Sequence, residues 1–477
     1  MAKQVSAFEE VMAARGLGMP AGGGAEITGA DPVFSTPFKI GETCAAVLAG
    51  IGVAVSDLWQ LKTGRTQKAA IDVRHAAAAL RSTSYAGRPD GAGVWQPIVS
   101  SGHLEMRKIT QPWPTKDGRW FLPHFGLPNL KARVLGVLGC EPNPGSVAKA
   151  VAGWDALELE GAIDEARACG AMVRTSEEWL AHPHGQALAA KPIVEIIKIG
   201  DSDPEPLPVG DRPLSGIRAL DLTRILAGPI CARTLAEHGA EVLMVTADGL
   251  PQIAEHVTDT SHGKRSCYLN LSEADDAARL KELVRTADVF SQGYRPGTLE
   301  NLGFSPAALA ALRPGLIYTS ISCFGADGPF SHRGGWEQVA QTVTGICHDG
   351  LADRPALLPA AACDYTTGYL AAYGVLLALA RRARDGGSYH VRVSLCQSGM
   401  FIYRQGKTSF AHDDMDLAPH ELDELRITSE TASGPLRHLG PVLSLSETPP
   451  AWARTTPVLG GDGAEWPRRP GDAAAAE

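Results

Sequence analysis

The apolar positions of this chain follow one clear pattern after about residue 214. Short apolar runs rich in β-branched residues alternate there with amphipathic stretches. The pattern predicts strands at 217–223, 240–246, 288–293 and 316–325, and helices at 229–239, 273–287 and 305–314. Strands that alternate with helices are typical of a parallel, doubly wound sheet with helices on both faces. We therefore expect a Rossmann-like α/β domain over residues 215–400, although no GxGxxG fingerprint follows its first strand.

The pattern before that boundary is mixed and predicts a smaller α+β domain. Residues 38–61 are apolar on nearly all sides, which predicts a buried helix, and no apolar run reaches membrane-spanning length without a break. Strands are expected around the turn at Lys116–Gly118, and amphipathic helices at 154–173 and 175–190. The expected organisation is an arm (1–35), a partial sheet-domain remnant with the small domain (36–205), a linker (206–214), the sheet domain, and a Pro-rich tail (401–477).

One segment is repeated inside the chain. When the apolar helix before "TGRTQKAAIDV" is laid over the one before "GGSYHVRVSL", Gly52 matches Gly374 and Gly64 matches Gly386 without a gap. The same register places Glu42 on Asp364. The chain is therefore predicted to hold two copies of a helix–turn–strand unit, each headed by a carboxylate.

Composition narrows the choice of partners. The formal net charge is −9, which argues against nucleic acid as a bulk partner because phosphate binding favours a basic surface. The nine cysteines form no CxxC pair, so we expect scattered core thiols in a reducing cytoplasm. The first residues lack the apolar core of a secretory signal, and no membrane partner is expected.

Five segments of the second half stand out in order along the chain: "IRALDLTRILAGPICARTLAEHGAEV" (217–242), "HGKRSCYLNL" (262–271), "ADVFSQGYRPGTLENLGF" (287–304), "LIYTSISCFGADGPFSHRGGWEQVAQTVTG" (316–345) and "DYTTGYLAAYG" (364–374). In sequence and in order these segments resemble the family III CoA transferases, the group that includes formyl-CoA transferase, carnitine–CoA transferase and α-methylacyl-CoA racemase.

The first half is similar to the smaller domain of that family, in "TKDGRWFLPHF" and "EEWLAHPHGQALAA". That domain follows the sheet domain in ordinary members and precedes it here, so the order resembles that of a permuted or partly duplicated member. The resemblance implies coenzyme A as co-substrate without a metal or redox cofactor, and acyl-CoA and carboxylic acid substrates. It also implies an assembly of two chains. This is either a homodimer, interlocked as in the family, or a pair formed with a related subunit.

Asp364 is the candidate nucleophile. From the local sequence alone it is a good helix N-cap, since Asp is among the residues favoured there. The resemblance places it at the family's catalytic aspartate, whose carboxylate forms an anhydride and then a thioester with CoA. Both roles are compatible, because a helix N-terminus stabilises an anion. Glu42, at the matching place of the repeat, is expected to be a relic.

Basic and small residues are the candidates for holding CoA. Arg295 in "GYRPG", with Lys264 and Arg265 in "HGKRS", could meet its phosphates, or could be solvated cations. Ala227, Gly228 and Gly368 would let the backbone approach a ligand, or would serve helix packing.

Trp336 and Gln341 are expected to line the acyl pocket. Racemase members have a proton-transferring His where Trp336 stands, so racemisation or isomerisation at the α-carbon is the less favoured alternative. Leu226 replaces a polar residue of some members, which favours a bulkier or more apolar acyl group. The rearranged order, and the altered segment after the second strand, leave a catalytically silent CoA-binding subunit as a further alternative.

Overall fold

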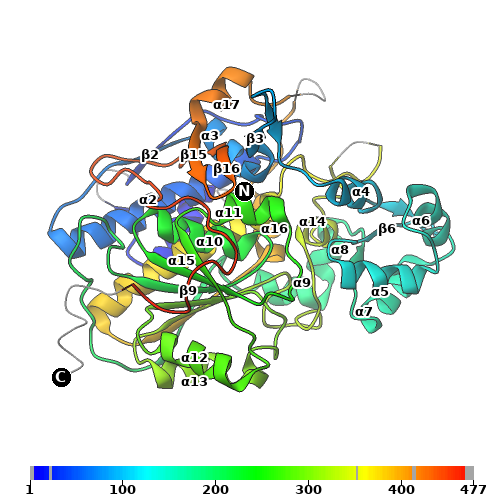
Figure 1. Ribbon diagram of the computed structural model, residues 1–477. Coiled ribbons are helices and arrows are strands. Elements are labelled where there is room, and N and C mark those ends of the chain that lie inside the picture. Colours follow the sequence, from blue (N-terminus) through cyan, green and yellow to red (C-terminus); the bar gives the residue numbers. More distant parts are fainter. Residues whose placement is uncertain (1–4, 21–23, 351–352, 411–414, 468–477) are drawn as a thin grey trace.

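The computed structural model describes residues 5–20, 24–350, 353–410 and 415–467. Its centre is a seven-stranded sheet with the strand order β11-β10-β9-β12-β13-β14-β8 (Figure 1). All neighbouring pairs are parallel except β14 with β8. The strands are β8 Glu195–Gly200, β9 Arg218–Leu222, β10 Glu241–Thr246, β11 Lys264–Tyr268, β12 Val289–Gln292, β13 Ile317–Ser322 and β14 Ser388–Ser394.

Helices cover both faces of this sheet, as a doubly wound fold requires. One face carries α12 and α13, which pack with Leu220 and Phe290 in an apolar cluster. The opposite face carries α10, α15 and α2 (Figure 1). The helices of the domain are α10 Ala227–Glu237, α11 Ala254–Thr260, α12 Ala274–Val284, α13 Pro306–Leu312, α14 Glu337–Val343, α15 Ala362–Asp385 and α16 Leu395–Arg404. The predicted Rossmann-like sheet is confirmed, and the antiparallel edge strand β8 was not predicted.

Helix α2 (Ile40–Thr63) is the predicted apolar helix, and by length and composition it could cross a membrane. The expectation that no apolar run is long enough to span a membrane is therefore wrong. The structure buries 78% of its apolar window and packs it beside α15, so α2 is a core helix here.

The predicted repeat is visible in the structure. Helices α2 and α15 each have 24 residues, and each ends before a glycine at its C-cap, Gly64 and Gly386. Helix α2 is followed by the strand β2 Ala69–Asp72 and then directly by the helix α3 Val73–Ala79. Helix α15 is followed in the same way by β14 and α16. The N-cap residues Lys39 and Ala361 also share nearly the same backbone angles (φ −79° and −81°).

A smaller unit precedes the sheet domain and lies at one end of it (Figure 1). Its three-stranded sheet has the order β5-β6-β7, and the predicted turn joins β5 to β6. The predicted helix at 154–173 ends earlier, because β7 follows it, and the one at 175–190 is divided by Pro183. The elements are α4 Ser101–Ile109, β5 Trp113–Pro114, β6 Trp120–Pro123, α5 Pro128–Leu138, α6 Pro144–Val151, α7 Ala156–Glu165, β7 Gly170–Met172, α8 Ser176–Ala181 and α9 Pro183–Ala189.

The remaining elements tie both ends of the chain to the body. Strand β1 pairs with β2 in parallel, and β17 completes that small sheet from the C-terminal region. A four-stranded sheet, β15-β16-β3-β4, likewise joins distant segments. The expected arm and tail therefore both contain strands. These elements are α1 Ala7–Arg15, β1 Ala25–Thr28, β3 Gly87–Pro89, β4 Trp95–Pro97, α17 Pro419–Leu425, β15 Arg426–Thr431, β16 Gly434–Leu439 and β17 Ser444–Leu445.

Candidate active site

Asp364 is the third residue of α15, and it does not cap that helix. The N-cap residue is Ala361, which makes no side-chain capping bond. Instead the carboxylate of Glu337, at the start of α14, accepts the backbone N–H groups of Cys363 (3.0 Å) and Asp364. Because the first turn of α15 is capped by another helix, the Asp364 side chain is available for a different role.

Glu337 is itself fixed in place. Its Oε1 accepts a hydrogen bond from Nε2 of Gln341 (2.6 Å), and Oε1 of Gln341 accepts the backbone N–H of Leu358 (2.8 Å). Burial raises the pKa of Glu337, while the Gln341 amide and the α15 N–H groups oppose the rise. Gln341 therefore holds the Glu337 carboxylate in place and also lines a cavity at this site.

Asp364 is only 8% exposed. Burial raises its pKa well above the usual range, and the neighbouring charge of Glu337 raises it further. The backbone N–H of Ala227 donates to the Asp364 carboxylate and lowers the pKa in part. The site therefore holds a desolvated carboxylate at a helix N-terminus, beside a backbone donor from a second helix.

That donor is the first residue of α10, directly after the loop that joins β9 to α10. Ile225 has φ of +75°, which is rare and costly for a β-branched residue. At Gly228 a side-chain carbon would overlap Thr223, so the loop needs glycine there. The strained turn brings the Ala227 N–H toward Asp364.

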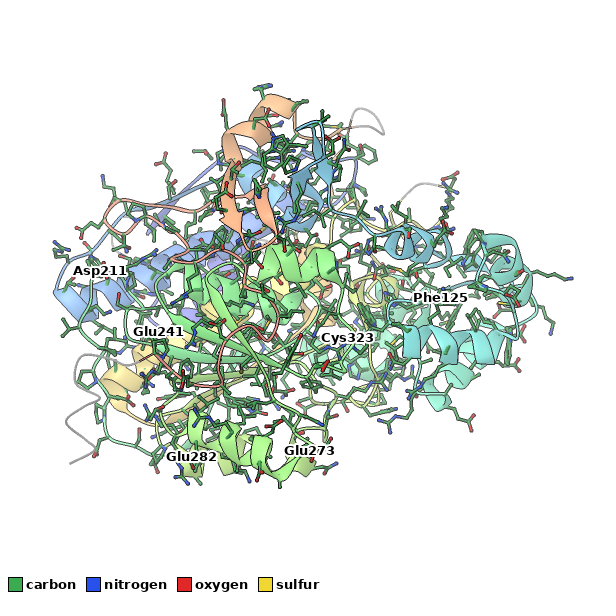
Figure 2. All side chains as sticks on the ribbon, viewed as in Figure 1. Phe125, Asp211, Glu241, Glu273, Glu282 and Cys323 are labelled. Atoms are coloured by element: carbon green, nitrogen blue, oxygen red, sulfur yellow. The ribbon has the colours of Figure 1, made fainter. Side chains whose placement is uncertain are left out.

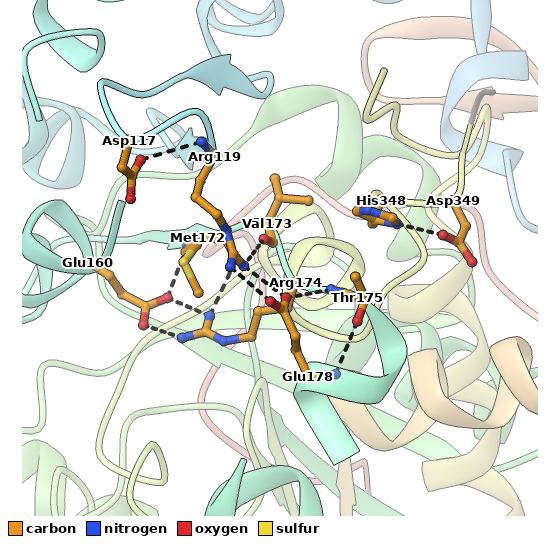
Figure 3. Close-up of polar contacts among 10 residues, drawn as sticks. All are labelled: Asp117, Arg119, Glu160, Met172, Val173, Arg174, Thr175, Glu178, His348 and Asp349. Carbon is orange, nitrogen blue, oxygen red and sulfur yellow. Dashed lines mark hydrogen bonds and ion pairs between the residues drawn. The ribbon is translucent and has the colours of Figure 1, made fainter. Parts of the chain in front are cut away.

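The small unit has a buried ion pair of its own and is held against this site by a backbone hydrogen bond and a partly buried ion pair. Arg174 binds Glu160 (2.6 Å), with both side chains almost fully buried (Figure 3). The backbone N–H of Arg174 donates to the carbonyl of Thr342 in α14 (3.1 Å). Arg333, just before α14, donates to Asp164 of the small unit (2.9 Å). The segment that carries Glu337 is thus anchored on both sides.

A cavity of about 610 Å³ lies between the small unit and the carboxyl ends of the sheet strands. Cys323 lines it at the end of β13, and Figure 2 places this residue between the sheet and the small unit that carries Phe125. Asp364 forms part of its wall. We call it the first cavity. Five arginines line it: Arg133, Arg167, Arg224, Arg295 and Arg333.

Most of this positive charge is uncompensated. Arg333 pairs with Asp164, whereas the other four arginines have no carboxylate partner among the described residues. The guanidinium groups of Arg295 and Arg133 instead donate to the carbonyl of Arg167 (3.1 and 3.0 Å). Unpaired guanidinium groups around a cavity are suited to phosphate groups.

A second cavity of about 460 Å³ is also lined by Asp364. Its lining mixes apolar and aromatic side chains, such as Leu358 and Trp120, with polar and charged ones, such as Gln338, Arg107 and Arg354. The two cavities share four lining residues: Ile225, Leu226, Trp336 and Asp364. Asp364 therefore lies in the wall that the arginine-lined first cavity shares with the second, mixed cavity.

Trp336 forms part of the partition. Its ring stacks on His124, with ring centroids 4.6 Å apart and planes at 22°. Nδ1 of His124 accepts the N–H of Gly126 (3.2 Å), which leaves Nε2 to donate to Gln338 (2.9 Å). Burial lowers the pKa of His124 to about 4. The imidazole is therefore neutral, with both nitrogens engaged.

Six of the nine residues singled out in the sequence lie at this site. Asp364, Arg295, Ala227 and Gly228 line the first cavity, Gln341 lines the second, and Trp336 lines both.

The other three predictions are corrected by the structure. Lys264 is fully buried and pairs with Asp221 (2.8 Å), so it supports the interior. Arg265 pairs with Asp462 (3.1 Å) and contacts the C-terminal region. Gly368 contacts Ala227 and Ile230, where a Cβ would lie 2.5 Å from the Ala227 carbonyl oxygen, so it serves the packing of α15 on α10.

Several site residues were missed from the sequence. Arg133 and Arg167 belong to the small unit, far from the sheet motifs in the chain, and only the fold brings them to the cavity. Arg224 stands within the quoted motif, and Arg333 and Glu337 flank Trp336, so they were within reach. The signal in the sequence was that these charged residues stand beside residues already predicted to belong to the site.

The N-terminal repeat keeps the carboxylate pair in altered form. The backbone N–H of Glu42 donates to Asp31 (2.8 Å), as that of Asp364 donates to Glu337. Glu42 is bound by Lys39 (3.2 Å), with both side chains one-third exposed. Glu42 therefore lacks the burial of Asp364.

The fold and site define an α/β protein with a buried acid in the wall between a phosphate-suited cavity and a second cavity of mixed lining. Among the described residues, no group of three or more His, Cys, Asp and Glu side chains could hold a metal ion. All nine cysteines are free thiols, and eight are buried.

Comparisons with known proteins agree with this class. Residues 214–421 match CoA-transferase family III. The chain is 33% identical over 347 residues to an acetyl-coenzyme A transferase, nodX, of Hypoxylon pulicicidum, covering 67% of this chain and 58% of that protein. It is 30% identical over 408 residues to an acyl-CoA transferase of Gibberella moniliformis, covering 77% and 71%. The chain belongs to CoA-transferase family III.

Among solved structures, a CAIB/BAIF family protein from Brucella suis is 27% identical, with a TM-score of 0.39. That match covers 47% of this chain and 65% of the solved one. The chain thus spans less than two thirds of that structure and of the Hypoxylon relative.

Proposed function

We propose that this chain transfers coenzyme A from an acyl-CoA to a carboxylic acid through a covalent intermediate on Asp364. The observation that carries the proposal is the position of Asp364 in the wall shared by two cavities, the first of which is lined by five arginines. The first cavity would hold CoA, with its phosphates on the arginines, and the second would hold the acyl group. The thioester carbon would then lie where the two cavities meet.

The chemistry needs no oxidant or reductant. The Asp364 carboxylate oxygen attacks the thioester carbonyl, the C–S bond breaks, and CoA leaves as a thiolate from a mixed anhydride. The thiolate then attacks the aspartyl carbonyl, which releases the first carboxylate and leaves an aspartyl-CoA thioester. The incoming carboxylate attacks the aspartyl carbonyl of this thioester, the C–S bond breaks, and the CoA thiolate leaves from a second mixed anhydride. The thiolate finally attacks its acyl carbon, giving the new acyl-CoA and free Asp364.

The surroundings of Asp364 suit such a nucleophile. Burial removes the water that would hydrolyse an anhydride or a thioester. The raised pKa makes the ionised carboxylate more nucleophilic, while the helix N-terminus and the Ala227 N–H still allow it to ionise. Each side of the exchange consists of one carboxylic acid and one thioester, so the free-energy change of the transfer is small.

Trapping of the anhydride or thioester tests the proposal. The protein would be incubated with a panel of acyl-CoA donors and hydroxylamine, and the peptide containing Asp364 would be examined by mass spectrometry. A hydroxamate on Asp364 is expected, and CoA should be released. If binding of CoA is intact and no donor gives a hydroxamate, transfer through Asp364 is wrong and a silent CoA-binding subunit remains. One relative of this chain, in Chloroflexus aurantiacus, is named a β subunit of a succinyl-CoA–L-malate CoA-transferase.

Racemisation at the α-carbon is the second candidate, and the geometry gives it less support. It requires a proton carrier opposite Asp364, and Trp336 cannot carry one. His124 is the histidine stacked on Trp336, but both of its nitrogens are engaged and its pKa is low. Loss of an α-deuterium without exchange of CoA would favour the racemase.

We also propose that residues 25–79 are the end of a second, incomplete sheet domain, so that the chain is a partly duplicated family member. The matched lengths and caps of α2 and α15 support this. The small unit and the sheet domain of one chain line the first cavity together, so one chain would close its own site.

A further inference from the structure

One buried carboxylate lies at the point where β9 ends and the turn toward the active site begins. Asp221 is completely buried, and its two oxygens are bound by different parts of the chain. Its Oδ1 accepts the backbone N–H of Thr223 (3.0 Å) and also the hydroxyl of that residue. Its Oδ2 accepts a hydrogen bond from Nζ of Lys264 (2.8 Å), which belongs to β11. Asp221 thus fixes the first residue after β9.

Lys264 connects that carboxylate to the far end of the turn. Its Nζ also donates to the backbone carbonyl of Pro229 (2.9 Å), in the first turn of α10. The side chains of Lys264 and Asp221 are both fully buried. Buried charges that are paired and hydrogen-bonded in this way tolerate little change of geometry. One ammonium group therefore holds both ends of the connection between β9 and α10.

Thr223 also supports α10 by direct packing. A Cβ at Gly228 would lie 2.2 Å from Cβ of Thr223 and 2.5 Å from its Oγ1, so the second residue of α10 lies against this side chain. The hydroxyl that lies near Gly228 is the one that binds Asp221. Because χ1 of a threonine has few allowed values, this bond fixes the surface on which α10 begins.

The strained residue of the turn lies between these two fixed ends. Ile225 has φ of +75°, and such a conformation persists in a β-branched residue only where the surrounding contacts hold it. If the start of the turn were released, Ile225 could relax to a negative φ. Ala227, two residues further on, would then move relative to α15.

The contact that depends on this geometry is the one between Ala227 and Asp364. The Ala227 N–H opposes the rise in the pKa of Asp364 that burial and the charge of Glu337 cause. Burial also raises the pKa of the neighbouring thiols of Cys323 and Cys363, so these groups are neutral at neutral pH. The ionisation of Asp364 is therefore sensitive to the position of the Ala227 N–H.

We propose that Asp221, Thr223 and Lys264 are positioning residues, which hold the turn after β9 so that the Ala227 N–H meets the Asp364 carboxylate. The inference rests on the proposed function for its meaning in catalysis, but the positioning itself can be measured without turnover. Removing the Thr223 hydroxyl frees the start of the turn and keeps the size of the side chain. Thr223→Val is therefore the sharpest probe.

The test follows the pKa of Asp364 by NMR of protein whose aspartate carboxyl carbons are labelled with carbon-13. The Asp364 signal is the one that is missing from Asp364→Asn. In Thr223→Val this pKa should rise by roughly one unit, because the carboxylate loses its backbone donor. The kcat for CoA transfer at pH 7, with the fastest donor among acetyl-, butyryl- and succinyl-CoA, should fall about tenfold. Thr223→Ala, which also lacks the hydroxyl, should give the same rise in pKa.

Two variants are the controls. Thr223→Ser keeps the hydroxyl and should keep the wild-type pKa of Asp364 and the wild-type kcat. Thr234→Val removes another buried hydroxyl from α10, one that donates to the carbonyl of Ile230 (2.9 Å). Its loss does not touch the turn, so the pKa of Asp364 should stay the same.

An unmoved pKa of Asp364 in Thr223→Val would overturn the inference, as would an equal rise in Thr223→Ser or in Thr234→Val. A kcat that falls by one factor at every pH, with no change in pKa, would show a merely structural role. The Asp364 hydroxamate is measured separately, on the wild-type protein. If it never forms while Thr223→Val still raises the pKa of Asp364, the transferase proposal fails and the positioning role stands.

Discussion

The Glu337 carboxylate in α14 accepts the backbone N–H of Asp364 in α15, so two acids meet at one helix N-terminus. Glu337 has taken the capping position, and its charge raises the pKa of the Asp364 carboxyl. The same contact therefore orients the candidate nucleophile and tunes its protonation. This relationship makes Glu337 a positioning residue that can be examined separately from Asp364.

Replacing Glu337 by Gln should move the acid limb of the kcat/KM profile to lower pH. Asp364 must be ionised to attack, and its pKa is raised by burial and by the charge of Glu337. Removing that charge lowers the pKa of Asp364, so the active form persists at lower pH. We expect a shift of roughly one pH unit, measured by CoA transfer between pH 4 and 9.

A purely structural Glu337 would behave differently. Its substitution would lower activity by the same factor at every pH and leave the midpoint of the acid limb in place. Gln341→Leu removes a donor to Glu337 but keeps both charges, so it separates loss of support from loss of charge. An unmoved limb in Glu337→Gln would contradict the electrostatic role.

Asp364→Asn should reduce CoA transfer by roughly a thousandfold or more while the affinity for CoA changes by about threefold or less. The amide keeps the shape of the side chain but cannot form the anhydride. Glu42→Gln, at the matching place in the repeat, is the control and should keep full activity. Residual transfer above about a tenth of the wild-type rate in Asp364→Asn would reject covalent catalysis at this residue.

The sheet domain could be predicted from the sequence because its signals are local. Each parallel strand is a short apolar run bounded by turns, and each helix has its own periodicity. The edge strand β8 was missed since Glu195–Gly200 adjoins the linker and only its antiparallel pairing with β14 makes it a strand. The pairing of β17 with β2 likewise joins residues too distant for any local signal.

The site was predictable where function depends on one motif. Asp364 and Arg295 stand inside recognisable segments, whereas Arg133 and Arg167 reach the cavity through tertiary packing. Lys264 was misjudged because a basic residue beside a turn gives no sign of burial. Its partner Asp221 lies 43 residues away, on β9.

Arg295→Met should weaken CoA binding by about tenfold. Arg295 lines the first cavity without a carboxylate partner among the described residues, so the loss falls on phosphate contacts. Calorimetry with CoA and with pantetheine, which has no phosphate, checks this, since pantetheine affinity should stay the same. Arg265→Met is the matched control, because Arg265 is bound by Asp462 away from the cavity. Equal losses for CoA and pantetheine would contradict a phosphate role.

Lys264→Met should destabilise the fold without changing the affinity for CoA. The substitution would leave Asp221 buried without its cation, which costs about 3–5 kcal/mol. Urea unfolding measures the loss. Removing both charges, in Lys264→Met with Asp221→Leu, should recover part of it, because the uncompensated charge is then gone. A stable Lys264→Met protein with weakened CoA binding would restore the phosphate role expected from the sequence.

Gly368→Ala sets two effects on α15 against each other. Alanine favours the helix by about 1 kcal/mol, but its Cβ would lie 2.5 Å from the Ala227 carbonyl oxygen and 2.8 Å from Cβ of Ile230. Backbone cannot yield as a flexible side chain does, so overpacking of about 1–3 kcal/mol should dominate and lower Tm.

Because α10 would move, the Ala227 N–H would lose its contact with Asp364, and kcat should fall while KM for acyl-CoA changes little. Gly374→Ala, six residues further along α15 and likewise tightly packed, is the control: it should lower Tm and leave kcat intact. If both variants lower kcat equally, the loss comes from general destabilisation and the specific coupling of Gly368 to Asp364 is wrong.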